Sequence, residues 1–459
     1  MDGAAAVLDI GKTNVKVATF ARDGALLWER AMPNRVLPGP PYPHADVEKI
    51  WDFLIAALAE ANRAHPISTI VATTHACTFG LIDDKGLVLP VMDYEFAGVD
   101  EIEPSYAPLR PAFSESFSPP LPAGLNFARQ LAWQKQSFPE AFTRARYFLT
   151  YPQYWAWRLC GIAAGEVTFL GAHSDLWAPR ERRFSSVVAA LGLNGLTAPM
   201  RAAHARLGPV KPDIAAAAGL GEGVDVLCGV HDSNASLLPH LASRKAPFTI
   251  VSTGTWVILM APGLSLDGLD PADDTLANVD VEGRPVATAR FMGGREYAAI
   301  AGAPASPDAA SLARVIVSGA MALPCFAGQG GPFAARKGEV RGAVSPADLP
   351  ALATLYLALM SDLMLTRLGV EAGDLIVEGS LAANPAYCAV LAAFRPTQPV
   401  SAGSDAAGTA RGAALLAQWP PRDLTPPPLV AAEASALEGL RGYREAWREA
   451  VLGVSGTDA

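Results

Sequence analysis

Two stretches of the chain, about 240 residues apart, share one plan: an apolar strand, a tight turn of small and polar residues, and a second apolar strand. The first is LDIGKTNVKVATF at residues 8–20, and the second is APFTIVSTGTWVILMAPG at residues 246–263. Apolar runs separated by such turns are typical of paired strands. Because each copy opens one half of the chain, the repeat predicts two similar domains whose turns face each other across a cleft.

The length of the chain supports this division, because 459 residues exceed what a single hydrophobic core usually holds together. A short polar break at residues 243–245 precedes the second copy. We therefore predict a first domain over residues 1–243 and a second over residues 244–459. Ala-rich helical stretches at residues 51–64 and 349–368 alternate with short β-branched runs, which indicates an α/β fold.

Charge and cysteine content argue against several classes of protein. The net charge of −9 is spread without long blocks of one sign, which disfavours a nucleic-acid surface. The five cysteines are scattered and never form a C-x-x-C pair, so neither a disulfide framework nor a zinc site is indicated. No signal peptide or apolar run of membrane-spanning length is visible. We expect a cytoplasmic protein with a small-molecule partner, and neither nucleic acid nor membrane as a partner.

The two turns suit the phosphates of a nucleotide. Phosphate oxygens are bound by converging backbone N–H groups, by hydroxyls and by a cation. The candidate ligands are Gly11, Lys12, Thr13 and Asn14 in the first turn and Ser252, Thr253, Gly254 and Thr255 in the second. Asp9 is a candidate carboxylate for Mg²⁺, acting through the water shell of the ion, because Mg²⁺ keeps waters and prefers oxygen. Taken alone, a turn of this kind is more often a plain hairpin.

A third stretch places an acid at the end of a strand. VLCGVHDSNASLLPHL, residues 226–241, runs an apolar strand into Gly229, then His231 and Asp232, and then an apolar helix. A carboxylate in that place can take the proton of a sugar hydroxyl as it attacks a γ-phosphate. The alternative is that Asp232 is the N-cap of the helix. The two roles are compatible.

Two stretches near the C-terminus are candidates for binding a purine. LIVEGSLAANPAYCAVLAAF at residues 375–394 predicts a strand, a turn at Gly379 and Ser380, and a helix. SDAAGTARGAALLA at residues 404–417 predicts a helix so rich in Gly and Ala that another group approaches its backbone closely. A flat purine ring between these elements fits the pattern, and so does helix packing through small residues.

Taken in order, the motifs D-x-G-x-T-N, G-x-H-D-x-x-A, S-T-G-T-W, G-S-x-x-x-N and D-A-x-G-x-A-x-G-A-A resemble those of the FGGY carbohydrate kinases, of the actin-like ATPase fold. The resemblance implies two ribonuclease-H-like domains around a deep cleft. It also implies phosphate transfer from ATP to a sugar hydroxyl with Mg²⁺ as cofactor.

The resemblance also assigns roles to residues. Asp232 resembles the catalytic base and, with Asp9, a carboxylate at the metal, while His231 and Asp232 together resemble the sugar-contacting pair. The implied adenosine site consists of Gly379, Ser380, Asn384 and Gly408. Two residues depart from the family pattern: Lys12, and Glu378 ahead of the Gly-Ser pair. These departures are expected to affect the affinity for the nucleotide more than the phosphate transfer.

Residues 73–96 occupy the place where members of this family line the sugar pocket. The stretches STGTWVILM, FMGGREY and FAGQGGPF resemble the deoxyketose branch, the L-fuculose and L-rhamnulose kinases. The candidate pocket residues are His75, Phe79 and Glu95, which combine hydrogen-bonding groups with an apolar wall, as a deoxysugar with a methyl end requires. His75 is equally well explained as a satisfied polar residue at a strand end.

We therefore predict an ATP-dependent kinase that forms the phosphate of a ketose, such as the 1-phosphate of L-fuculose or L-rhamnulose. Two alternatives are a regulator that binds sugar or nucleotide without turnover, and a nucleotide or polyphosphate hydrolase that places water where the sugar hydroxyl would lie. Asp9, Asp232 and both turns favour the kinase, because a pure sensor needs no base aligned with a phosphate. A homodimer is left open.

Overall fold

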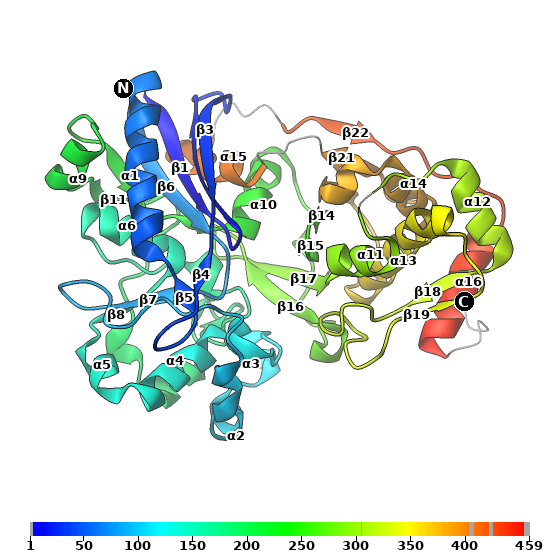
Figure 1. Cartoon of the computed structure of the whole chain (residues 1–459), viewed down its shortest axis with the longest axis horizontal. Helices are drawn as coiled ribbons and strands as arrows, with labels where there is room; N and C mark the ends of the chain where they lie inside the picture. Colours follow the sequence, from blue (N-terminus) through cyan, green and yellow to red (C-terminus); the bar gives the residue numbers. More distant parts are fainter. Residues whose placement is uncertain (1–2, 304, 404–407, 422–425, 454–459) are drawn as a thin grey trace. The chain divides into compact units, whose positions relative to one another are not determined.

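The computed structural model describes residues 3–303, 305–403, 408–421 and 426–453. The described residues divide into two compact units (Figure 1). The first unit holds those of Met1–Ser243, Ala277–Pro285 and Ala407–Pro426, and the second holds those of Arg244–Leu276, Val286–Ala406 and Pro427–Ala459. The sequence-based border after residue 243 stays a prediction for the domains, and two segments from beyond it lie with the first unit.

The first unit is built on a seven-stranded mixed sheet with the order β11-β12-β6-β1-β2-β3, in which β13 also pairs with β6. Its strands are β1 (Ala4–Ile10), β2 (Asn14–Phe20), β3 (Leu26–Pro33), β6 (Ile67–Thr74), β11 (Arg206–Pro209), β12 (Asp225–Leu227) and β13 (Val230–His231). Strands β1, β2 and β3 run antiparallel to one another in sequence order, whereas β6 runs parallel to β1, and β12 and β13 run parallel to β6.

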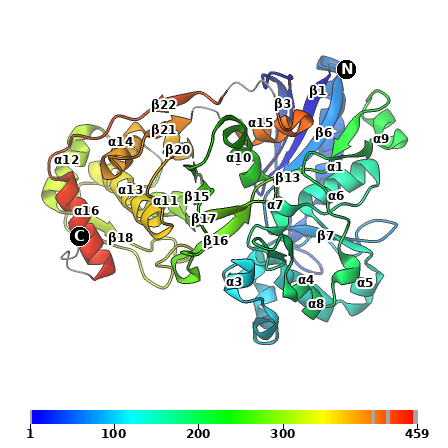
Figure 2. The same cartoon turned by 180° about the vertical axis from the view of Figure 1, so that it is seen from behind.

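Alternate residues of β1 enter two different cores, as the period of two in a strand requires. Leu8 and Ile10 pack with the buried face of α1 (Val47–Ala64) and with α6 (Tyr151–Cys160). Val7 packs on the other side with Ala235 of α10 (Asp232–Ser243) and Ala413 of α15 (Gly408–Leu415). Figures 1 and 2 show α1 along one face of this sheet and α10 and α15 against the other. Both faces of the sheet are therefore covered.

The small residues of α15 are explained by helix packing. A Cβ at Gly412 would overlap the carbonyl oxygen of Ala235 on α10, so only glycine fits at this crossing. The hydroxyls of Ser236 and Thr409 lie 2.8 Å apart across the same contact. The other helices and short strands of the first unit are α2 (Glu103–Tyr106), α3 (Phe113–Ser116), α4 (Phe127–Ser137), α5 (Pro139–Arg144), α7 (Val167–Leu170), α8 (Ser186–Ala190), α9 (Pro212–Ala217), β4 (Val36–Leu37), β5 (His44–Ala45), β7 (Phe79–Ile82), β8 (Tyr147–Thr150), β9 (Trp177–Ala178) and β10 (Arg183–Phe184).

The second unit repeats the topology of the first. Its sheet has the order β16-β17-β15-β14-β20-β21-β22. The strands are β14 (Phe248–Thr253), β15 (Val257–Pro262), β16 (Thr275–Val279), β17 (Pro285–Phe291), β20 (Asp374–Gly379), β21 (Val400–Gly403) and β22 (Leu429–Ala431). Residues Ala277–Val279 of β16 and Pro285 of β17 group with the first unit. As in the first sheet, three successive antiparallel strands (β14, β15, β17) are followed by strands parallel to the first of them (β20, β21), and the last strand, β22, is antiparallel.

One long helix, α13 (Leu349–Arg367), forms the centre of the second unit. The segment Pro346–Arg367 is long and apolar enough to cross a membrane by length and composition, but 83% of its most apolar window is buried inside the unit, which makes it a core helix. Around it lie α11 (Gly293–Ala301), α12 (Ala309–Ser318), α14 (Pro385–Phe394), α16 (Leu440–Leu452) and the small β18 (Met321–Leu323) and β19 (Glu339–Arg341) pair.

Candidate active site

Three parallel strands of the first unit end at one edge of its sheet. Asp9 of β1 is in register with Thr73 of β6, which in turn is in register with Val230 of β13. Asp9, His75 and Asp232 therefore follow one another across the carboxyl ends of neighbouring strands, where open α/β sheets bind their ligands. The structure brings these three predicted site residues together.

Asp9 is a buried carboxylate whose ionised form a bound cation would stabilise. Burial, and after it the charge of Asp232, raise its pKa from 3.8 to about 7, while Lys16, in register with it on β2, opposes the rise. A divalent cation would relieve this cost, so the two carboxylates fit Mg²⁺. Among the described residues no group of three or more His, Cys, Asp and Glu could hold a metal, so such an ion would take most of its ligands from water and phosphate.

Asp232 is the first residue of α10, and one of its carboxylate oxygens is fully used. Its Oδ1 accepts from His231 Nε2 at 3.0 Å and from the backbone N of Ser233 at 2.6 Å. Burial acts to raise the pKa of Asp232, but the hydrogen bond and charge of His231 outweigh it and hold the pKa below its usual value. The side chain is 32% exposed. Asp232 therefore bonds at the helix start and also keeps an ionised, accessible carboxylate.

His231 is held from several sides. Its ring Nδ1 lies 2.7 Å from Asn234 Oδ1, its backbone N donates to Thr168 Oγ1 at 3.1 Å, and Phe169 packs edge-on against the ring. Burial alone would lower the pKa of His231, but the contacts with Asp232 and Asn234 raise it. The imidazole is thus rigidly placed and favoured in its cationic form.

Behind His231 lies a buried acid that sequence reasoning missed. Glu166 Oε2 accepts from Thr168 Oγ1 at 2.5 Å, and burial raises the pKa of Glu166 to about 7. Asn234 was also missed. A lone acid within the apolar run GEVTFLG, and an amide three residues after His231 at a helix start, are the signals that could have drawn attention to them.

The first turn is a hairpin that joins β1 to β2, closed by the Gly11 N–H, which donates to the Asn14 carbonyl at 2.9 Å. Thr13 and Asn14 are exposed. Lys12 is already engaged: its Nζ is paired with Asp93, lies 3.5 Å from Glu95 Oε2 and sits 4.6 Å from the centre of the Tyr94 ring. Phosphate binding by Lys12 stays a prediction that requires it to leave these acids.

The predicted sugar residues separate into two groups. His75 lies near Asp232, its ring 5.5 Å from that of Tyr94 and 5.4 Å from that of Tyr151, and burial lowers its pKa. Glu95 is exposed beside Lys12. Phe79, by contrast, is 3% exposed and packs against Phe127 in the hydrophobic core, so the structure does not bring it to this cluster.

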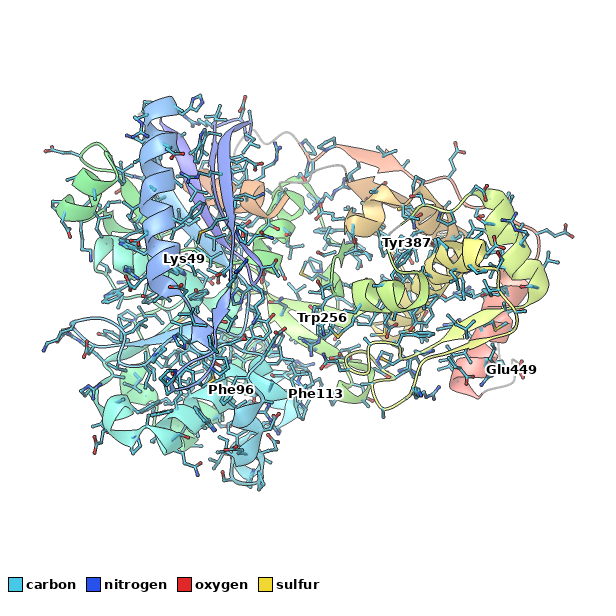
Figure 3. All side chains as sticks on the ribbon, in the orientation of Figure 1. Lys49, Phe96, Phe113, Trp256, Tyr387 and Glu449 are labelled. Atoms are coloured by element: carbon cyan, nitrogen blue, oxygen red, sulfur yellow. The ribbon has the colours of Figure 1, made fainter. Side chains whose placement is uncertain are left out.

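In the second unit, the corresponding turn follows β14 and is tied to the end of β20. Thr253 Oγ1 donates to the Glu378 carbonyl at 2.5 Å and accepts from the Leu381 N–H at 2.8 Å. Gly379 has a φ of +79°, and a Cβ there would overlap the Thr253 carbonyl oxygen. Gly254, Thr255 and Ser380 are exposed beside this joint, and Figure 3 labels Trp256 on the same turn.

The four residues of the predicted adenosine site are not gathered in one unit. Gly379, Ser380 and Asn384 belong to the second unit and Gly408 to the first, while residues 404–407 lie outside the described residues. Asn384 is 5% exposed and caps α14: its Oδ1 accepts from the Tyr387 N–H at 3.2 Å and its Nδ2 donates to Thr354 Oγ1 at 3.0 Å. A role for Asn384 toward a nucleotide stays a prediction.

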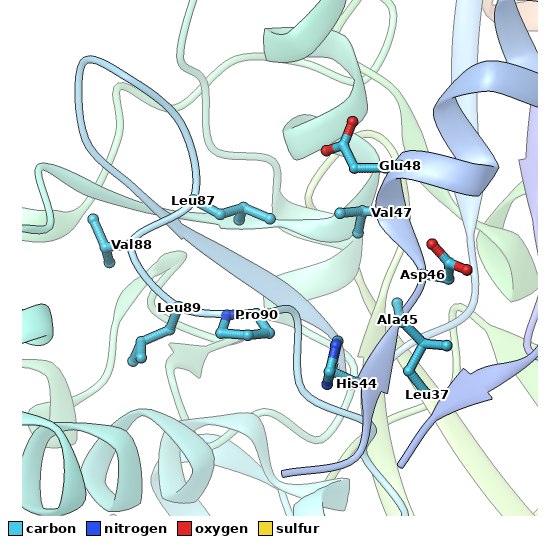
Figure 4. A pocket seen from close by; sticks show the side chains of 10 residues that line it. All are labelled: Leu37, His44, Ala45, Asp46, Val47, Glu48, Leu87, Val88, Leu89 and Pro90. Carbon is cyan, nitrogen blue, oxygen red and sulfur yellow. The ribbon is translucent and has the colours of Figure 1, made fainter. Parts of the chain in front are cut away.

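A separate hollow of about 330 Å³ lies at the start of α1 (Figure 4). Its walls come from the β4–β5 region, the first turn of α1 and residues 87–90, and Glu48 at its rim is bound to Arg158 at 2.6 Å. The described candidate residues at the ends of β1, β6 and β13 do not line it. It is therefore not the site predicted from the motifs.

Two units of one mixed-sheet topology, with carboxylates at the ends of parallel strands, define a two-domain protein of the actin-like ATPase fold, as predicted. Two family models match the chain. The model described as "Carbohydrate kinase FGGY, C-terminal domain" matches residues 245–426, and the model described as "FGGY family of carbohydrate kinases, N-terminal domain" matches residues 123–239. A solved carbohydrate kinase from Novosphingobium aromaticivorans is 34% identical, with 99% of each chain covered and a TM-score of 0.89. The chain belongs to the FGGY family of carbohydrate kinases, so the predicted family and enzyme class are confirmed.

More distant relatives differ in the sugar that their names state. A solved xyloylose kinase from Brucella ovis is 19% identical over 99% of this chain and 100% of its own, with a TM-score of 0.81, which supports the fold alone. The L-fuculokinase of Escherichia coli (strain K12) is 26% identical over 275 residues. That match covers 57% of this chain and 57% of the relative, so the chain spans little more than half the length of the curated relative it matches.

Proposed function

We propose that this protein is an ATP-dependent kinase that transfers the γ-phosphate to a hydroxyl of a ketose. The observation that carries the proposal is the state of Asp232. Its Oδ1 is occupied by His231 and Ser233, and none of the described residues donates a hydrogen bond to its Oδ2. A partly exposed carboxylate with one free oxygen, at the ends of three parallel strands, suits a base for a sugar hydroxyl.

In the proposed reaction the sugar oxygen attacks the γ-phosphorus, the bond to the β-phosphate oxygen breaks, and ADP leaves with that electron pair. The hydroxyl proton passes to Asp232 Oδ2. With its lowered pKa, Asp232 is a weak base, which is sufficient where the transition state is loose and the hydroxyl becomes acidic only as its bond to phosphorus forms. His231 keeps the carboxylate ionised until the proton arrives and holds it oriented during the transfer.

Mg²⁺ fits beside Asp9, where it would be held through water with Asp232 nearby. Its chemistry there would be to neutralise the charge of the phosphates. The fit rests on the raised pKa of Asp9, which reflects burial and the repulsion of Asp232 and is only partly offset by Lys16.

For the nucleotide we propose contacts within each unit taken separately. In the first unit these are the Thr13 hydroxyl and the backbone N–H groups of Lys12 and Thr13, in the turn whose Thr13 and Asn14 are exposed. In the second unit they are the exposed Gly254 and Thr255, and Ser380 beside Gly379. Thr253 supports this turn rather than offering a free hydroxyl, because both of its hydrogen-bonding roles are taken.

A deoxyketose such as L-fuculose or L-rhamnulose is the proposed acceptor, giving the 1-phosphate. Support comes from the partial similarity to an L-fuculokinase and from the site itself, where His75 lies beside the Tyr94 ring and the Asp232 carboxylate is partly exposed. We also propose a cytoplasmic enzyme with a small-molecule sugar as its partner. In support of that location, the five cysteines, all among the described residues, form no disulfide.

The test is an enzyme-coupled assay of ADP release from ATP and Mg²⁺, with and without a panel of ketoses that includes L-fuculose, L-rhamnulose and D-xylulose. ADP release that depends on one of these sugars supports the kinase. Release that is independent of sugar would instead indicate a hydrolase. Ligand binding without release, measured by calorimetry on the same samples, would indicate a regulator.

A further inference from the structure

The amide of Asn234 connects the His231–Asp232 pair to a segment from much later in the chain. Asn234 is 1% exposed and lies in the first turn of α10. Its Oδ1 is 2.7 Å from His231 Nδ1, and its Nδ2 donates to the Val279 carbonyl at 2.5 Å. Val279 ends β16 and belongs to Ala277–Pro285, one of the later segments that lie in the first unit.

These two contacts determine how the amide and the imidazole are oriented. A backbone carbonyl can only accept, so the NH₂ group of Asn234 must face Val279 and its oxygen must face His231. Because that oxygen can only accept, Nδ1 of His231 must donate. The opposite ring nitrogen, Nε2, then points to Asp232 Oδ1 at 3.0 Å. One amide thus sets the direction of the ring that holds the proposed base.

The Val279 side chain is tightly packed. It is fully buried, and a Cβ at Gly171 would overlap its side chain, so the two segments meet at the closest distance that glycine allows. Gly171 directly follows α7, and Thr168 of α7 accepts the backbone N–H of His231. The same short helix therefore contacts both the Val279 segment and His231, which leaves the Val279 carbonyl little freedom to move relative to the ring.

We propose that Asn234 is a positioning residue for phosphoryl transfer, and that the Val279 carbonyl sets its orientation. Asn234 holds His231 so that Asp232 Oδ1 is occupied and Oδ2 is presented to the sugar hydroxyl. The inference rests on the proposed function for its kinetic consequence. The structural part of the inference, that Asn234 holds the His231 ring in place, can be tested whatever the reaction is.

The kinetic test compares Asn234→Leu, Asn234→Asp and the control Ser236→Ala. Leu has a similar shape but neither accepts nor donates. Asp keeps an acceptor toward His231 and loses only the donor toward the Val279 carbonyl. Ser236 lies on the same helix, and its hydroxyl contacts Thr409 and the backbone carbonyl of Asp232 but not His231. Because a misplacement of about 1 Å can cost about 10²-fold, Asn234→Leu should lower kcat about 10- to 100-fold while the KM values for ketose and ATP stay within about twofold. Asn234→Asp should lose markedly less, and Ser236→Ala nothing.

Equal losses in the Leu and Asp variants, or an unchanged kcat in the Leu variant, would overturn the inference. Should the Leu variant fail to fold, Asn234→Ala, which adds no volume against Val279, carries the same expectation. Crystal structures of the wild type and the variants give a second readout that needs no activity. The His231–Asp232 contact should be lost in the Leu or Ala variant and kept in the Asp and Ser236→Ala variants. A His231 ring that does not move in the Leu or Ala variant would refute the proposal, and this result does not depend on sugar phosphorylation.

Discussion

Replacing Asp9 by Asn should make the protein more stable and less active at the same time. The carboxylate of Asp9 is buried and faces Asp232, and these two effects raise its pKa from the ordinary 3.8 to about 7. The ionised form that Mg²⁺ would require is therefore the form that the fold tolerates least. Asn keeps the shape of the side chain and removes the charge, so the folded chain no longer carries that cost.

The size of the effect follows from the shift in pKa. A difference of about three units, at 1.36 kcal/mol each, corresponds to roughly 4 kcal/mol as an upper bound. Relaxation and water penetration reduce such values, so about 2 kcal/mol is a realistic expectation. Since a domain of this size gains roughly 2 to 4 °C in Tm per kcal/mol, the transition of the first unit should rise by about 4 to 8 °C.

The sign depends on pH in a defined way. Between about pH 4 and pH 7 the folded chain keeps a proton on Asp9 that the unfolded chain has released, so the free energy of unfolding falls as pH rises through that window. The gain of Asp9→Asn over the wild type should therefore be largest at pH 8 and less than about half as large at pH 5.

The measurement is differential scanning calorimetry of both proteins at pH 5 and pH 8, with EDTA and without nucleotide. Lys16→Met is the matched control, because Lys16 opposes the rise in the pKa of Asp9, so its removal should destabilise the protein at pH 8. A variant Asp9→Asn that is no more stable than the wild type at pH 8, or whose gain does not change with pH, would show that Asp9 is not the strained carboxylate described above. The same variant should show a large loss of sugar-dependent ADP release.

Three further outcomes are expected. Asp232→Asn should lower sugar phosphorylation by about 10² to 10⁴ and leave ATP binding, measured by calorimetry, near the wild-type value; retention of most of the turnover number would exclude it as the base. Gly254→Val should raise the KM for ATP more than that for sugar without changing Tm, because no described atom lies within 4 Å of the position its Cβ would take. Gly379→Ala should instead lower the Tm of the second unit, because φ is +79° there and the added Cβ meets the Thr253 carbonyl; an unchanged Tm would contradict that packing.

Local patterns predicted the architecture well. The two strand–turn–strand stretches became the β1–β2 and β14–β15 hairpins, and the helical stretch at residues 51–64 lies in α1. Such elements depend on hydrophobic periodicity and turn chemistry, which are visible within a dozen residues. The strand end at Asp232 was predictable for the same reason, because a strand, a glycine and a helix follow one another directly in the sequence.

The prediction was weaker where a residue's partner lies far along the chain. Lys12, a candidate phosphate ligand, is paired with Asp93 and Glu95, some 80 residues later. Phe79, a candidate sugar residue, lies in the hydrophobic core, and a strand pattern does not say which face meets the core. The roles of both residues stay predictions. The contact between Asn234 and His231 could not be predicted from the sequence, because Asn234 is itself held by the backbone carbonyl of Val279. A backbone carbonyl is present at every residue, so the sequence does not show which one is used.

Because two later segments of the chain belong to the first unit, they also affect when this unit can fold during translation. A ribosome releases the chain from its N-terminus, and domains commonly begin to fold in that order. Here the first 243 residues emerge without the carbonyl that orients Asn234 and without α15, whose Ala413 and Leu415 are buried against the same core as Val7. Until α15 has emerged, the nascent first unit exposes that apolar surface, so most of the second unit must be translated before the first unit can be completed.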